Sequence, residues 1–193
     1  FKTVPYKPEE LRKKVINYIK ERLGFLAPDT RPIELKQAVL KSDCNDIVGV
    51  FKRVEALSEI SAEKYFLKAA KVCERTSNIL KGAKNVGAIT DRPLQINDVK
   101  EELLKEDMEK EVWMAYTANN VAIKNLIKEE RYKEATKAYG EAFFAALHRF
   151  FDNVLVNAED SALRGNRLAM MQAINKLYTN DVADLAMLPQ IVV

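Results

Sequence analysis

The stretch FFDNVLVNAEDSALRGNRLAMMQAI, residues 150–174, contains the corner of a predicted helical hairpin. An apolar segment runs into Glu159 and Asp160, whose charges suit the N-terminus of the helix that follows. On that helix Arg167 shares one face with four apolar residues at helical spacing, namely Leu163, Met170, Ile174 and Leu177. A charge on a buried face is costly without a partner. We therefore expect an ion pair between Arg167 and Asp152, near the end of the preceding helix.

Helical periodicity extends from this corner over nearly the whole chain. Residues 131–156 carry one apolar stripe at spacings of 3 or 4, formed by Tyr139, Phe143, Leu147, Phe150 and Val154. Similar patterns predict further helices over residues 7–25, 29–41, 45–60, 61–82, 98–105, 107–129 and 160–178, and a final turn within 179–188. No segment shows the alternation of a β-strand. The predicted fold is an all-α, multi-helix bundle in two helical layers.

Residues 82–97, GAKNVGAITDRPLQIN, interrupt the periodicity with two glycines and a proline. We expect an N-terminal basic helical segment over residues 1–82, a linker over 83–97 and a C-terminal helical domain over 98–193. Charge divides at the same place. Residues 1–90 carry 18 Lys/Arg and 11 Asp/Glu, whereas the rest of the chain carries 13 and 17. The basic half could attract a polyanion, and the alternative is an ordinary lysine-rich surface.

Common catalytic and metal-binding signatures are missing from the sequence. Two cysteines and one histidine, His148, form no disulfide framework, zinc motif or catalytic triad. The six glycines form no phosphate-binding loop. No apolar run reaches the roughly 18 residues that span a bilayer, and no signal-peptide pattern is present. The chain begins with Phe1 rather than Met, so we expect a piece of a longer protein. Because its two cysteines form no disulfide framework, we expect a reducing cytoplasm.

Two blocks of this sequence resemble the β subunit of bacterial glycyl-tRNA synthetase. The C-terminal block matches that family at Phe150, Phe151, Asp152, Val154, Val156, Glu159, Asp160, Arg164, Asn166, Arg167 and Leu168. An upstream block matches at Arg53, Val54, Ala56 and Leu57, and then at Arg75, Asn78, Ile79 and Leu80. Cys73-Glu74 stands where the family often has Asn-Lys, which argues against an RNA contact at Glu74. The resemblance covers roughly residues 10–190.

The resemblance implies a helical tRNA-binding module without a catalytic site of its own. In that family an α subunit carries the aminoacylation core, and the C-terminal domain of the β subunit resembles the anticodon-binding domain of arginyl-tRNA synthetase. The chain would then support ATP-dependent attachment of glycine to tRNA-Gly. Its expected partners are tRNA-Gly, the α subunit and the remainder of the β subunit, with no membrane. ATP and Mg would be cofactors of the whole enzyme only.

Five residues are the predicted RNA contacts. Arg75, Asn78 and Lys81 lie at i, i+3 and i+6 on one helix, and Arg164 and Asn166 lie at the corner. Arginine and asparagine can hydrogen-bond the edges of unstacked bases, and lysine can contact phosphates. The alternatives are a solvated face for the cations, a helix-end cap for Asn78 and a structural role at the corner. If these alternatives hold throughout, the chain is a non-catalytic helical scaffold for protein interactions.

Overall fold

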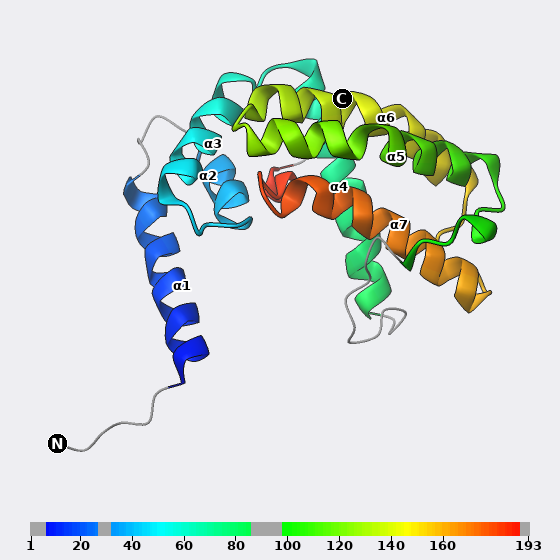
Figure 1. The fold of residues 1–193 in the computed structure, drawn as a ribbon, viewed down its shortest axis with the longest axis horizontal. Coiled ribbons are helices and arrows are strands. Elements are labelled where there is room, and N and C mark those ends of the chain that lie inside the picture. The colour runs from blue at the N-terminus through cyan, green and yellow to red at the C-terminus, as the bar shows by residue number, and fades with distance from the viewer. Residues whose placement is uncertain (1–6, 27–31, 86–97, 190–193) are drawn as a thin grey trace.

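The computed structural model describes residues 7–26, 32–85 and 98–189, and the described part of the chain is all-α (Figure 1). Within it lie α1 (Pro8–Leu26), α2 (Ile33–Leu40), α3 (Ile47–Glu59), α4 (Lys64–Asn85), α5 (Asp107–Lys128), α6 (Tyr132–Asn153) and α7 (Ser161–Thr179). Two short 3₁₀ turns, η2 (Glu101–Leu103) and η3 (Leu185–Met187), flank the C-terminal helices. The predicted all-α class is confirmed.

Local side-chain chemistry sets several helix boundaries. The Asp46 carboxylate accepts from the Val48 N–H at 3.0 Å and caps α3. Asp160 caps α7 in the same way. Helix α6 ends at Asn153, earlier than the predicted residue 156, because Val154 adopts an extended conformation and is buried in the core. The predicted helix over residues 98–105 is only the 3₁₀ turn η2.

The C-terminal helices form two layers. Helices α5 and α6 make an antiparallel hairpin, and α4 and α7 cross beneath it (Figure 1). The predicted apolar stripe of α6 is buried along its whole length. At the crossing with α4, a Cβ atom added to Gly140 would lie 2.6 Å from the Tyr65 carbonyl oxygen, so the two backbones are in close contact. Hydrogen bonds also join the layers, including one of 2.7 Å between Thr136 and Tyr178.

Helix α4 joins the two halves that the sequence predicted as separate. Its buried residues belong to the same hydrophobic core as α5, α6 and α7. Residues 83–85 of the predicted linker are helical, and residues 86–97 lie outside the described part. The predicted segments therefore do not correspond to two separate cores, because the apolar face of α4 has its partners on the far side of the boundary.

The N-terminal helices pack at one end of this core. Helices α2 and α3 contact each other, and α2 contacts η3. Helix α1 extends away from them (Figure 1), and its apolar side chains Leu11, Val15 and Tyr18 are exposed. None of the described helices is both long enough and apolar enough to cross a membrane.

Candidate nucleic-acid interface

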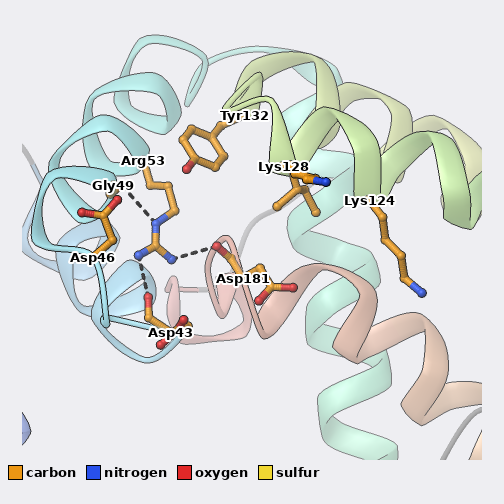
Figure 2. Close-up of a pocket in the computed structure, with 9 residues that line it drawn as sticks. Asp43, Asp46, Gly49, Arg53, Lys124, Lys128, Tyr132 and Asp181 are labelled. Atoms are coloured by element: carbon orange, nitrogen blue, oxygen red, sulfur yellow. Dashed lines mark hydrogen bonds between the residues drawn. The ribbon is translucent and has the colours of Figure 1, made fainter.

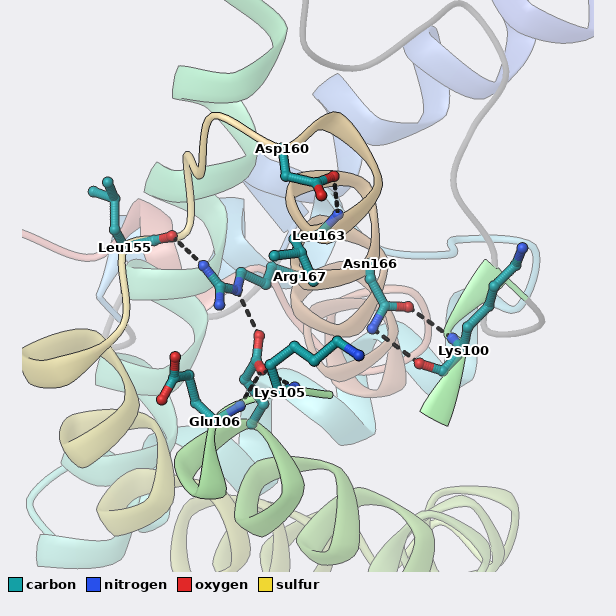
Figure 3. Close-up of polar contacts among 9 residues, drawn as sticks. Lys100, Lys105, Glu106, Leu155, Asp160, Leu163, Asn166 and Arg167 are labelled. Carbon is teal, nitrogen blue, oxygen red and sulfur yellow. Dashed lines mark hydrogen bonds and ion pairs between the residues drawn. The ribbon is translucent and has the colours of Figure 1, made fainter. Parts of the chain in front are cut away.

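Arg167 forms a buried ion pair, but its partner is Glu109 and not the predicted Asp152. The Arg167 Nε donates to Glu109 Oε1 at 2.5 Å, and the two side chains are 8% and 0% exposed. The other guanidinium contact reaches the Leu155 carbonyl at 2.7 Å (Figure 3). Asp152 lies on the exposed side of α6, where it pairs with His148 one helical turn earlier. The prediction of a partner was correct, and the identity of the partner was wrong.

Glu109 also completes the N-terminus of α5. Its second carboxylate oxygen accepts from the backbone N–H groups of Lys105 and Glu106 at 2.6 and 2.7 Å. Together with the reciprocal bond from residue 109 to the Glu106 side chain, these contacts make a capping box. The ion pair therefore attaches the middle of α7 to the first turn of α5, and the Leu155 contact adds the corner loop.

Asn166 has a structural role in place of the predicted RNA contact. Its side chain is 3% exposed. The amide oxygen accepts from the Lys100 N–H at 2.7 Å, and the amide nitrogen donates to the Lys100 carbonyl at 3.1 Å (Figure 3). Both ends of the amide are thus used to hold the segment before α5 against α7. An RNA base could contact Asn166 only after these two bonds break.

Arg164 lies half-buried at the start of α7. One terminal nitrogen donates to the carbonyl of Ala158 at 2.8 Å and, more weakly, to that of Glu159 at 3.4 Å. These bonds hold the loop that precedes the helix. No other hydrogen bond or ion pair of this guanidinium occurs within the described residues, so part of its hydrogen-bonding capacity is available to a ligand.

Helix α4 places the other three predicted contacts on its surface. Asn78 and Lys81 are exposed, and Arg75 is half-buried. The Arg75 guanidinium lies over the ring of Phe151, 5.8 Å from its centroid. Among the described residues Arg75 forms no ion pair, whereas its neighbour Glu74 is paired with Lys71 at 2.8 Å. The charge of Glu74 is therefore partly compensated, and the cation of Arg75 is not.

Phe151 also contributes to this surface. The sequence interpretation did not distinguish it from the aromatic residues of the core. Phe143 and Phe150 are fully buried, as expected for a helical stripe. Phe151 is only partly buried and packs its edge against Phe150. It directly follows the stripe residue Phe150, about 100° around the helix from it, and this offset is the signal that could have identified it. Arg75 and Phe151 together form a cationic, partly aromatic surface, which suits stacking with a nucleobase.

We define the α4 surface as Arg75, Asn78, Lys81 and Phe151. It offers stacking, amide hydrogen bonds and positive charge, but no nucleophile or general base. In residues 7–26, 32–85 and 98–189, no three His, Cys, Asp or Glu side chains gather as a metal site would require. The chemistry of this surface is that of binding.

Comparison with known proteins finds a family match over the region that contains this surface. The family model described as "DALR anticodon binding domain" matches residues 70–183. Among curated relatives, the glycine–tRNA ligase beta subunit of Desulfatibacillum aliphaticivorans is 31% identical over 88% of this chain and 23% of its own length. That of Geotalea uraniireducens (strain Rf4) is 32% identical over 93% of this chain and 24% of its own length. The chain thus spans about a quarter of these relatives.

Proposed function

Because the chain belongs to the DALR anticodon binding domain family, we propose that it is the tRNA-binding module of a glycine–tRNA ligase beta subunit. The observation that carries the proposal is the α4 surface, which lies within the matched residues 70–183. Arg75 and Lys81 supply charge for phosphates, Asn78 supplies an amide for a base edge, and Phe151 supports stacking.

The proposed RNA is tRNA-Gly, and the proposed contact region is its anticodon. Anticodon bases are unstacked in a loop, so side chains can reach both their faces and their edges. Arg164 is a further proposed contact, through the nitrogens that do not hold the corner loop. Asn166 supports the site indirectly, because it fixes the segment before α5.

The ligation chemistry is proposed to lie outside this chain. The α4 surface has no group for activating glycine, and the relatives named glycine–tRNA ligase beta subunit are about four times as long as the matched region. We infer that the rest of the beta subunit and an α subunit are partners, that ATP and Mg act there, and that the enzyme is cytoplasmic.

Binding of tRNA-Gly transcripts to the chain at several salt concentrations tests the proposal. We expect log Kd to depend linearly on log salt concentration, and each phosphate contact contributes roughly 0.7–0.9 to the slope. Arg75→Ala and Lys81→Ala should each lower the slope by about that amount. Lys110→Ala is the matched control, because Lys110 is an exposed lysine on α5 that is already paired with Asp107.

Altered anticodons then separate recognition from general charge attraction. Weaker binding of the altered transcripts supports anticodon recognition, and Asn78→Ala should reduce that preference more than it reduces the salt slope. Equal binding of all transcripts would leave a basic surface without recognition. Absence of binding at low salt would refute the proposal and favour the scaffold alternative.

A further inference from the structure

A polar pocket of about 340 Å³ lies at the other end of the α5–α6 hairpin. Its walls come from the loop between α2 and α3, from α3, the end of α5, the first residue of α6 and the turn after α7 (Figure 2). Tyr132 at the pocket and Asn153 at the corner are the two ends of α6, so about 33 Å of helix separates them. The pocket is therefore distinct from the corner of residues 150–167.

Arg53 forms one wall of this pocket, and most of its N–H groups already have acceptors within the protein. Its guanidinium is buried and donates to the carbonyls of Gly49, Asp43 and Asp181 and to the Ser42 hydroxyl, at 2.6–3.1 Å. These bonds tie α3 to the turn after α7. Since nearly all its N–H groups have acceptors, Arg53 fixes the shape of the pocket and is not the main group available to a ligand.

Tyr132 is the group in the pocket whose hydroxyl is available to a ligand. Its side chain is 8% exposed, yet its hydroxyl makes no hydrogen bond to any residue in the described part of the chain. Figure 2 shows the hydroxyl directed into the pocket beside Arg53. Because no sealed side-chain polar atom of the described residues lacks a hydrogen-bond partner, this hydroxyl is open to the pocket. Burial raises the pKa of Tyr132, so at neutral pH the hydroxyl keeps its proton and can donate.

The remaining polar groups combine an acceptor with cations. The Asp181 carboxylate is exposed, turns toward the α5 side of the pocket, and Lys124 and Lys128 extend from that wall (Figure 2). A lone phosphate is disfavoured, because Asp43 and Asp181 carry negative charge beside it. A lone cation is disfavoured by the two lysines. The groups instead suit a ligand with two parts. One part is a neutral ring with hydrogen-bond donors and acceptors on one edge, and the other is an anionic group attached to it.

A nucleotide within an RNA chain has this chemistry. We propose that the pocket receives one unstacked nucleobase that carries an exocyclic amino group. Asp181 accepts from the amino group, the Tyr132 hydroxyl donates to an adjacent ring nitrogen or carbonyl oxygen, and Lys124 and Lys128 hold the flanking phosphates. Cytosine, adenine and guanine have such an amino group, and uracil has none. The volume is at the low end of the roughly 300–1,000 Å³ of ligand pockets, so it suits one nucleoside. This inference rests on the proposed RNA-binding function.

Titration of the chain with CMP, AMP, GMP and UMP, followed by the NMR signals of the Gly49 and Tyr132 amides, tests the pocket directly. We expect saturable shifts with the three amino-bearing nucleotides and at least about fivefold weaker binding of UMP. Asp181→Asn should remove this discrimination, because an amide can turn to donate to the uracil carbonyl. Equal binding of UMP, or no saturable shift with any nucleotide, would overturn the proposal.

Two tyrosine variants separate binding from folding. Tyr132→Phe should weaken the amino-bearing nucleotides while the unfolding midpoint stays unchanged, because its hydroxyl has no partner in the described protein. Tyr139→Phe is the control, since the Tyr139 hydroxyl donates to the Ile174 carbonyl at 3.1 Å inside the core. It should lower the midpoint and leave nucleotide binding intact.

The tRNA experiment shows which of the two proposals has failed. If tRNA binds through Arg75 and Lys81 but Tyr132→Phe and Asp181→Asn bind it as wild type does, only the pocket proposal is overturned. If nucleotides fill the pocket but tRNA does not bind, the proposed function is refuted, and with it the assignment of the pocket to RNA.

Discussion

Replacement of Arg167 by methionine tests the most deeply buried charge pair that we describe. The substitution keeps an apolar chain of similar length in the core and leaves Glu109 with no cationic partner. Removing one member of a buried pair typically destabilises a protein by about 3–5 kcal/mol. Glu109 retains two backbone N–H donors, from Lys105 and Glu106. Because these bonds still stabilise the carboxylate, we expect a loss near the lower limit, about 3 kcal/mol.

Urea unfolding followed by circular dichroism measures this loss. With an m-value of about 1–3 kcal/mol/M in urea, a loss of about 3 kcal/mol lowers the midpoint by roughly 1–3 M. Arg149→Met is the matched control, because Arg149 pairs with Glu111, two residues from Glu109 on the same helix, but both side chains are about half exposed. We expect the control to shift the midpoint little, since water already solvates both charges.

A double variant then identifies the cause. Glu109→Gln in the Arg167→Met background removes the unpaired buried charge and retains an acceptor for the backbone N–H groups. We expect it to recover part of the lost stability, so that the two substitutions together cost less than the sum of the single changes. If Arg167→Met shifts the midpoint no more than Arg149→Met, the buried pair does not stabilise the fold as argued.

Further predictions concern backbone geometry and thiol reactivity. Gly140→Ala should destabilise by about 2–3 kcal/mol because of the contact with the α4 backbone, whereas Gly165→Ala, where nothing lies within 4 Å of the new Cβ, should stabilise by about 0.5–1 kcal/mol; thermal unfolding compares them, and equal effects would contradict the close crossing. Glu130 has a positive φ of 58° at the end of α5, so Glu130→Gly should be more stable than Glu130→Ala by about 1 kcal/mol. Inside a helix the alanine variant is the more stable one, and the same order at residue 130 would rule out backbone strain there. Complete burial raises the pKa of Cys73 to about 12, so it stays a thiol at neutral pH, and Ellman's reagent should modify Cys44 well before Cys73 in the native state; equal rates would argue against this packing.

Features that depend on neighbouring residues could be predicted from the sequence. The α6 stripe from Tyr139 to Val154 is buried as its spacing predicted, and Asp160 caps α7 at the helix N-terminus where its charge was expected. These signals act over a few residues, because helical periodicity and capping are local properties. The helix predicted over residues 7–25 shows the limit of this reasoning. Its periodicity predicted a helix correctly, but Leu11, Val15 and Tyr18 of α1 are exposed in the described chain.

In the candidate site, too, some features could be predicted from local sequence and others depend on the tertiary structure. Arg75, Asn78 and Lys81 share a helix, so their common surface followed from spacing alone. The exposure of Phe151 beside Arg75 did not, because it depends on how α4 crosses α6. The pocket could not be predicted from the sequence either, since its walls come from five segments that meet only in the folded chain.

The corner shows most directly what each level decided. By itself, the sequence determined that Arg167 faces the core and needs a partner, because helical geometry places it among apolar residues. Only the tertiary structure selected Glu109, which is 58 residues away in sequence, over the nearby Asp152. The physical reason is that the packing of α5 on α7 brings the buried carboxylate of Glu109 to the arginine, whereas Asp152 remains on the exposed side of α6, where its carboxylate lies 2.6 Å from the His148 ring.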